Sequence, residues 1–184
     1  MTAILLVGCA SSSGTKQQVT TSEGNVVTTY DDPQYGIRLT YPGDWQEQSV
    51  PFMMRPKGTI IVLIAPSDLG ATKMPPTLSV VAQDVKAGNN PEQLDAMQKQ
   101  IIDKAGKQFG DFKLVESGAA KLGSEQARRV VYTGTKMGVS VEVMNVVTLH
   151  NGRQYGVAYS SDPVLYSQYL PQVQRVIDSV QFAK

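Results

Sequence analysis

Residues 139–159 read VSVEVMNVVTLHNGRQYGVAY, and this stretch decides the fold. Two runs rich in β-branched and aromatic residues flank Asn151-Gly152, a pair that suits the two positive-φ positions of a type I′ turn. The stretch therefore predicts an antiparallel hairpin whose register is set by a two-residue turn. The predicted partners are His150 with Arg153, Thr148 with Tyr155, Val147 with Gly156, Val146 with Val157, Asn145 with Ala158, and Met144 with Tyr159.

Both faces of this hairpin carry apolar or small side chains near its centre. A hairpin with one face in water shows polar residues on that face, so we expect helices to cover both sides. One helix is predicted to start at Asn90-Pro91 and another at Asp162-Pro163, where a capping side chain precedes a proline at the first helical position. Their apolar stripes are Leu94, Met97, Ile101 and Ala105 in the first, and Leu165, Tyr169, Val173, Val176, Ile177 and Val180 in the second.

The remaining apolar runs predict strands that come in groups rather than alternating with helices. We expect them at residues 26–30, 37–41, 59–65, 77–85, 112–117 and 126–133. Grouped strands indicate an α+β class, with an antiparallel β-sheet sandwiched between α-helices. We assign residues 26–184 to a single domain of this kind.

The first residues bear on location. Residues 1–13 read MTAILLVGCASSS, and the ending Leu6-Val7-Gly8-Cys9 resembles the bacterial lipobox, in which a diacylglycerol is attached to the cysteine sulfur. The apolar run is short and no Lys or Arg precedes it, so we interpret residues 1–8 as a truncated lipoprotein signal segment. Cys9 is then the lipid attachment site, and residues 9–25 a flexible linker. The alternative is an apolar N-terminus with a chance cysteine.

Composition excludes several functions. The chain has 17 Lys and Arg against 16 Asp and Glu, a net charge of +1, so it lacks the basic excess that nucleic-acid binding requires. A single Cys and a single His exclude an internal disulfide and a Cys/His zinc cluster. No glycine-rich phosphate loop or nucleophile elbow is present, and His150 has no evident carboxylate partner nearby. We expect no cofactor and no enzymatic activity.

Residues 35–45, YGIRLTYPGDW, resemble the entry motif of the PsbP-like families, in which an aromatic-Gly start leads into an alternating strand that ends in Tyr-Pro-x-x-Trp. The ending at residues 176–182, VIDSVQF, resembles their C-terminal helix. The resemblance implies the Mog1/PsbP-like fold. Members include photosystem II extrinsic proteins, their cyanobacterial lipoprotein relatives, and periplasmic lipoproteins such as the DcrB-like group, and none is an established enzyme as a class.

Two groups of residues are candidate sites. Asp31, Asp32 and Asp44 could offer carboxylate oxygens to Ca²⁺ or Mn²⁺, although aspartate is also a favoured turn former. Phe52-Met53-Met54 follows a proline, and these three large apolar residues form either an exposed partner contact or a patch buried under the edge of the sheet.

These observations together predict a lipid-tethered, non-catalytic envelope lipoprotein that serves as a binding or assembly module for a membrane-associated protein complex. We expect it to face the periplasm or cell exterior, or the thylakoid lumen in a cyanobacterium. The alternatives are a carrier of a small apolar ligand and, in a photosynthetic source, a photosystem II accessory protein. A carrier needs an apolar cavity, whereas a docking module needs an exposed contact surface.

Overall fold

We describe the fold from a computed structural model of the chain, which describes residues 14–22, 24–49, 57–67, 74–85 and 90–183. The strands are β1 (Thr15–Thr20), β2 (Val26–Asp32), β3 (Ile37–Pro42), β4 (Gln46–Glu47), β5 (Thr59–Ile64), β6 (Thr77–Asp84), β7 (Gly110–Leu122), β8 (Glu125–Lys136), β9 (Val139–His150), β10 (Arg153–Ser161) and β11 (Gln181–Phe182). The helices are α1 (Pro91–Gln108) and α2 (Pro163–Asp178).

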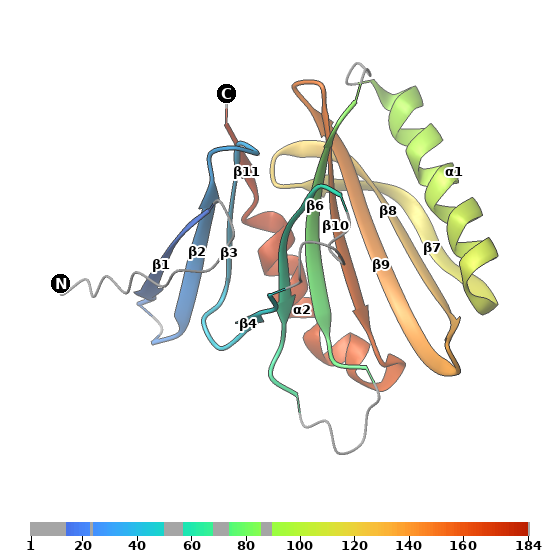
Figure 1. Cartoon of the computed structure of the whole chain (residues 1–184), viewed down its shortest axis with the longest axis horizontal. Helices are drawn as coiled ribbons and strands as arrows, with labels where there is room; N and C mark the ends of the chain where they lie inside the picture. Colours follow the sequence, from blue (N-terminus) through green and yellow to red (C-terminus); the bar gives the residue numbers. More distant parts are fainter. Residues whose placement is uncertain (1–13, 23, 50–56, 68–73, 86–89, 184) are drawn as a thin grey trace.

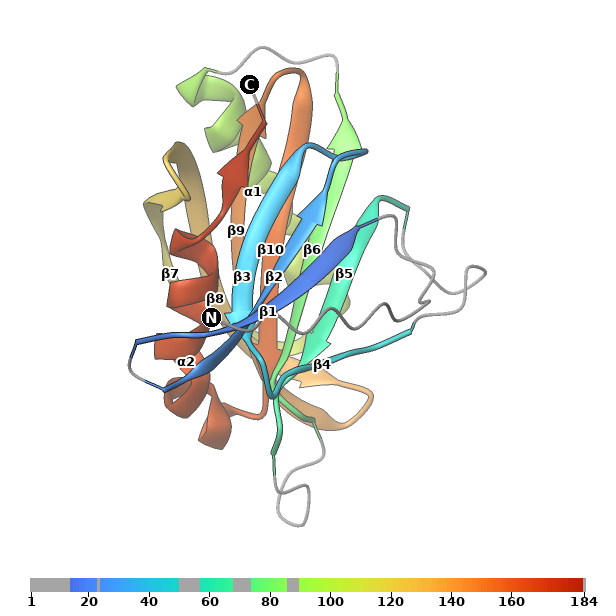
Figure 2. The same ribbon diagram turned by 90° about the vertical axis from the view of Figure 1, so that its left-hand side faces the viewer.

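The strands form two antiparallel sheets. The large sheet has the order β4-β5-β6-β10-β9-β8-β7, and the small sheet has the order β1-β2-β3-β11. The small sheet and α2 lie on one side of the large sheet, and α1 lies on the other (Figure 1). The expected α+β class is therefore confirmed. One face of the large sheet is covered by α2 together with the small sheet, rather than by a helix alone (Figure 2).

The β9–β10 hairpin has the predicted register at every pair named above. Asn151 and Gly152 have φ angles of 49° and 74°, as a type I′ turn requires. Because side chains alternate across a strand, this register sends Val146 and Val157 into the core on the α2 side. The opposite face of β9 contributes Val141 and Val143 to a second cluster.

Each helix begins at the predicted cap and covers one of these clusters. The Asn90 side chain accepts a hydrogen bond from the Gln93 N–H at 2.9 Å, and Asp162 accepts one from the Val164 N–H at 2.9 Å. Helix α1 packs on β7, β8 and β9, whereas α2 contacts β10, β9, β7 and also β3 of the small sheet. Within the described residues, neither helix has the length and hydropathy needed to cross a membrane.

The expectation of a flexible linker through residue 25 is wrong for residues 15–20, because these residues form β1. They pair along their whole length with β2, which would otherwise present a free edge. All six residues of β1 are exposed, so backbone pairing rather than burial holds the strand. Two further contacts fix its position: Gly14 packs so tightly on the Tyr30 ring that an added Cβ would lie 2.4 Å from it, and Lys16 forms an ion pair with Glu47.

Candidate functional site

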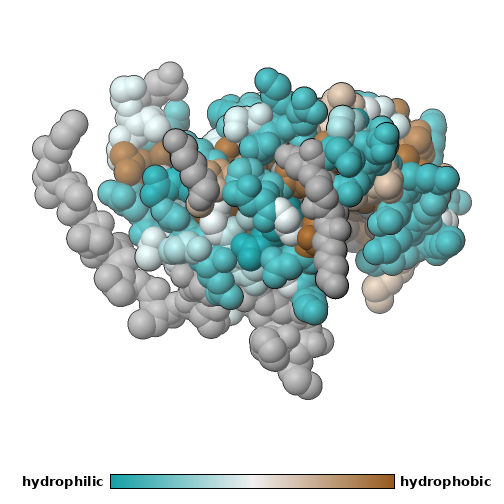
Figure 3. Space-filling model, turned by 90° about the horizontal axis from the view of Figure 1, so that it is seen from above, coloured by the Kyte–Doolittle hydropathy of each residue, from teal (hydrophilic) through white to brown (hydrophobic). Residues whose placement is uncertain are grey.

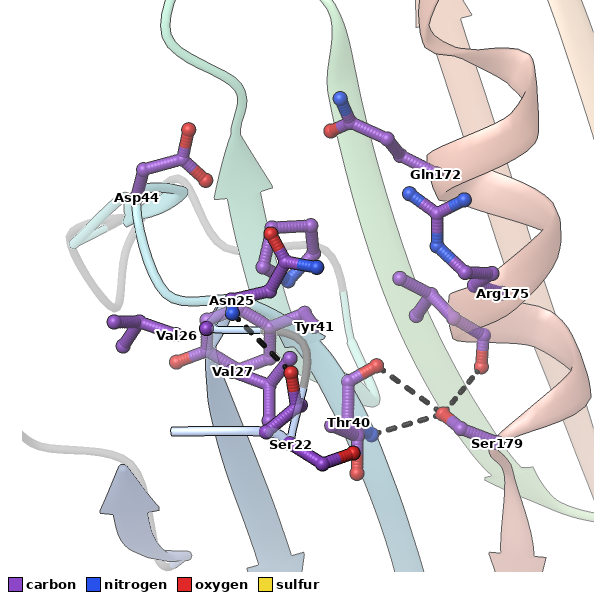
Figure 4. A pocket seen from close by; sticks show the side chains of 14 residues that line it. Ser22, Asn25, Val26, Val27, Thr40, Tyr41, Asp44, Gln172, Arg175 and Ser179 are labelled. Carbon is purple, nitrogen blue, oxygen red and sulfur yellow. Dashed lines mark hydrogen bonds between the residues drawn. The ribbon is translucent and has the colours of Figure 1, made fainter. Parts of the chain in front are cut away.

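An open groove of about 800 Å³ lies between the C-terminal half of α2 and the small sheet (Figure 4). One wall is α2, and the other is the β1–β2 connection together with the turn between β3 and β4. The lining residues are Thr21, Ser22, Gly24, Asn25, Val26, Val27, Thr40, Tyr41, Pro42, Asp44, Gln172, Arg175, Val176 and Ser179. Polar and apolar side chains both line it, so the groove suits a ligand with both characters.

The floor of the groove is fixed by Ser179, at the C-terminal end of α2. Its Oγ accepts a hydrogen bond from the Thr40 N–H at 2.9 Å and lies within donating distance of two main-chain oxygens, 3.1 Å from that of Thr40 and 2.8 Å from that of Val176. These bonds join the helix end to β3. Because the hydroxyl is engaged by main-chain groups rather than by a base, Ser179 is placed as a structural link and not as a nucleophile.

The α2 wall presents the side chains of Gln172 and Arg175, which project side by side over the groove (Figure 4). The Trp45 Nε1–H donates to Gln172 Oε1 at 2.9 Å, which orients the Gln172 amide. Arg175 is exposed, and its guanidinium makes no ion pair within the described part of the chain. This wall therefore offers hydrogen-bond donors to a ligand.

The opposite wall carries a carboxylate, that of Asp44, which is exposed in the turn after β3. Below it, burial raises the pKa of Tyr41 to about 12, with the nearby Glu47 charge adding to the effect and a hydrogen bond from Thr28 opposing it. The Tyr41 phenol is therefore neutral at physiological pH and can only exchange hydrogen bonds. The lining thus offers hydrogen-bond donors, hydrogen-bond acceptors and one carboxylate.

The predicted metal ligands do not come together. Asp32 is buried: its Oδ1 accepts the N–H groups of Gln34 and Tyr35 at 3.1 and 3.2 Å, and its Oδ2 accepts the Tyr30 hydroxyl at 2.9 Å. Asp31 instead accepts from Arg38 Nε at 2.9 Å, and Asp44 faces the groove. The three carboxylates are therefore engaged separately, and turn formation accounts for Asp32. Across the described ranges, no group of three His, Cys, Asp or Glu side chains is placed to hold a metal ion.

The structure gives His150 a carboxylate partner that the sequence analysis missed. His150 Nδ1 lies 3.1 Å from Glu125 Oε1, and Nε2 lies 3.0 Å from the Ala183 main-chain oxygen. The ring stacks on Phe182, with centroids 5.0 Å apart. His150 thus joins the start of β8, the β9–β10 hairpin and the C-terminal segment.

The other predicted site residues, Cys9 and Phe52-Met53-Met54, lie outside the described residues, so lipidation and the contact patch remain predictions. Elsewhere, the large exposed apolar side chains are spread over β1, β2, β7, the β8–β9 turn and α2. They are Val19, Val26, Leu114, Val115, Met137 and Val164. The end of the molecule at the top of Figure 1 is mainly hydrophilic, with separate small apolar areas (Figure 3). Among the described residues, the groove is thus a better binding candidate than any apolar surface patch.

No family model matches the sequence, and no curated protein shows a significant sequence match. Solved structures, in contrast, share the architecture of two antiparallel sheets and two helices, and they define it as a PsbP-like fold. The predicted fold resemblance is therefore confirmed.

Three solved structures illustrate this likeness. Cyanobacterial PsbP (CyanoP) from Synechocystis sp. PCC 6803 has a TM-score of 0.60 and 15% identity, over 85% of this chain and 92% of its own. LpqN of Mycobacterium tuberculosis, described as involved in cell envelope biogenesis, has a TM-score of 0.59 and 16% identity, over 93% and 92%. Protein PA94 of Pseudomonas aeruginosa has a TM-score of 0.53 and 16% identity, over 89% and 94%. At such identities the likeness is one of fold.

Proposed function

We propose that the chain is a lipid-anchored domain outside the cytoplasm that has no catalytic activity and binds a membrane-associated envelope protein through the groove beside α2. The observation that carries this proposal is the chemistry of the groove. Its α2 wall offers donors for which the described residues supply no ion-pair partner, and its opposite wall offers a carboxylate, while the Ser179 hydroxyl is engaged by main-chain groups. Such a site can hold a partner but has no group poised to transform one.

The fold likeness to a cyanobacterial PsbP and to an envelope-biogenesis protein supports a role in the cell envelope. The lipobox-like segment before Cys9 supports attachment to a membrane. A tether of this kind raises the effective concentration of the domain at the membrane face, so a groove of modest affinity suffices. The alternative, a carrier of a small apolar ligand, fits the groove less well because it is open and half of its lining is polar.

The anchor is tested by growing bacteria that express the chain behind an intact export signal with labelled palmitate. We expect the wild-type chain to incorporate the label and to fractionate with membranes. Cys9→Ser should lose both properties, because serine has no thiol to carry the diacylglycerol that would anchor the chain. An unlabelled wild-type chain would contradict lipid anchoring.

Groove binding is tested in the same membranes with a photo-crosslinking residue placed at Asn25, inside the groove, or at Lys104, on exposed α1. We expect a discrete crosslinked product with a membrane-associated protein from position 25 only, and its loss in Cys9→Ser. Equal crosslinking from both positions would show that contact is non-specific. A turnover activity that depends on His150 or Asp32 would overturn the non-catalytic proposal.

A further inference from the structure

We infer that the groove recognises an extended peptide segment that carries one acidic and one basic side chain, with Arg175 and Gln172 binding the acid and Asp44 binding the base. This inference rests on the proposed function and specifies the chemistry of the partner. It is drawn from three observations: the fixed amide of Gln172, the guanidinium beside it, which makes no ion pair with the described residues, and the opposite charge on the far wall.

The orientation of the Gln172 amide is set by Trp45. The indole is 4% exposed, so its N–H cannot turn to water, and it donates to Gln172 Oε1 at 2.9 Å. An indole nitrogen is only a donor, and a buried donor left unsatisfied is costly, so the amide oxygen must face Trp45. The amide NH₂ is consequently directed away from the indole, where its two hydrogens are available to a ligand.

Arg175 lies three residues after Gln172, on the same side of α2. Figure 4 shows the guanidinium beside the amide, with both groups over the groove. The guanidinium carries five N–H donors in a planar fork that matches a carboxylate. The guanidinium fork and the amide NH₂ are both hydrogen-bond donors on one wall, and such a pair favours an anionic group.

Asp44 makes the groove unsuitable for a purely anionic ligand. Its exposed carboxylate lies on the wall opposite Arg175 and would repel a second negative charge. An anionic membrane surface presents many phosphates at once, so it fits this charge arrangement poorly. A peptide with an acidic and a basic side chain places one charge at each wall, and its backbone can contact Val26 and Val27, which also line the groove and are at least partly exposed. The volume of about 800 Å³ lies within the range of specific ligand sites.

The test titrates the full chain, with Cys9→Ser to keep it free of lipid, by nitrogen-15 NMR. The first probe is an N-acetylated, C-amidated alanine peptide with one Glu and one Lys separated by two alanines, and the matched probe has Gln at both positions. We expect the charged peptide to shift the side-chain signals of Gln172 and Arg175. Its Kd should be at least about tenfold lower than that of the neutral peptide, since a charge-assisted hydrogen-bonded pair is worth roughly that factor.

Four variants assign the binding energy. Arg175→Gln should raise the Kd about tenfold, and Asp44→Asn severalfold. Gln172→Glu keeps the acceptor for Trp45 but replaces the donors by a carboxylate, so it should abolish binding of the Glu-containing peptide while the Tm stays unchanged. Lys104→Gln, on exposed α1, is the control and should leave the Kd as it is.

Equal affinity for the two peptides, or an Arg175→Gln variant that binds as well as wild type, would overturn the inference. The inference would also be overturned if the chain bound inorganic phosphate or phosphatidylglycerol vesicles through Arg175 but did not bind the peptide. The site would then recognise phosphate. Persistence of the crosslink from position 25 in Arg175→Gln would refute this inference alone. Absence of that crosslink in the wild-type chain would instead refute the proposed function.

Discussion

The two faces of the large sheet are covered unequally. Helix α2 buries five side chains, Tyr166, Tyr169, Val173, Val176 and Ile177, whereas α1 buries only Leu94 and Ala105. The cluster under α2 is continuous from the small sheet through β5, β6, β8, β9 and β10. The cluster under α1 has few fully buried members, and its other partners are only partly buried. The difference indicates that α2 and the small sheet hold the fold together, while α1 is a peripheral cover.

This asymmetry has a consequence for the groove. The groove opens beside α2, whose inner face is among the most buried parts of the chain. Gln172 and Arg175 are thus displayed from a helix whose neighbours Val173 and Val176 are fixed in the core. A binding site supported in this way is pre-organised, which reduces the entropy lost when a partner binds.

The largest difference is expected between Ile177→Ala and Ile101→Ala, the same truncation on the two helices. Ile177 is 1% exposed in the cluster under α2, so its truncation should lower the free energy of unfolding by about 2–5 kcal/mol. Ile101 is only partly buried under α1, and its truncation should cost about 1 kcal/mol. Urea denaturation followed by circular dichroism measures both. Equal losses would mean that α1 carries as much of the fold as α2.

A second pair of variants compares glycines in two hairpin turns: the β7–β8 turn, which packs against the end of α2, and the β9–β10 turn, which has more space around it. Gly123 (φ 57°) lies so close to the end of α2 that an added Cβ would be 2.0 Å from the Val180 main-chain oxygen. For Gly152 (φ 74°), the nearest atom found is the Val85 main-chain oxygen, at 3.9 Å. An alanine at either position should lower the free energy of unfolding by roughly 1 kcal/mol, because an L residue is strained in the left-handed conformation. Gly123→Ala should lower it by about 1–3 kcal/mol more, because the added Cβ clashes with the Val180 main chain.

Thermal denaturation of the two glycine variants provides the measurement, with the wild-type chain as reference. The Tm of Gly123→Ala should be clearly below that of Gly152→Ala. If the order is reversed, the contact between the β7–β8 turn and α2 contributes less than the structure implies, and the β9–β10 turn is the more constrained of the two.

The elements predicted correctly from the sequence are those specified by local signals. Asn151-Gly152 sets a hairpin register through backbone angles alone, and Asn90-Pro91 and Asp162-Pro163 mark helix starts within a few residues. The Glu125 partner of His150 was missed because it depends on the β8–β9 register. That register is set by a turn at Met137-Gly138, where Met137 has a φ of 52°, and a methionine gives no turn signal.

The groove was missed for a related reason. Its two walls lie more than 120 residues apart in the sequence, and the packing of α2 against β3 brings them together. In the sequence, Gln172 and Arg175 are simply polar residues that flank the apolar stripe of a helix. The β1 strand was interpreted as linker because Thr and Gln occur in both, and its pairing depends on the open edge of β2 rather than on a core of its own.

The smallest expected effect comes from a charge on the α2 side of the large sheet. Burial raises the pKa of Glu142 above its ordinary value of 4.5, close to the phenols of Tyr159 and Tyr166. Because the folded-state pKa is the higher one, protonated Glu142 favours folding below pH 4.5, and this contribution is lost as the pH rises through the folded-state value.

Glu142→Gln should therefore stabilise the fold at pH 7, by less than about 1 kcal/mol because the side chain is only partly buried, and the gain should vanish near pH 4. Chemical denaturation at both pH values measures this difference. The matched control is Glu116→Gln, because Glu116 Oε2 lies 3.6 Å from Arg129 Nη2. Neutralising Glu116 removes a favourable ion pair, whereas neutralising Glu142 removes the cost of burying a charge. The control should show no gain at pH 7. A gain in both variants would indicate relief of general negative charge, and a gain in neither would mean that water reaches Glu142 on this face as freely as it reaches the α1 side.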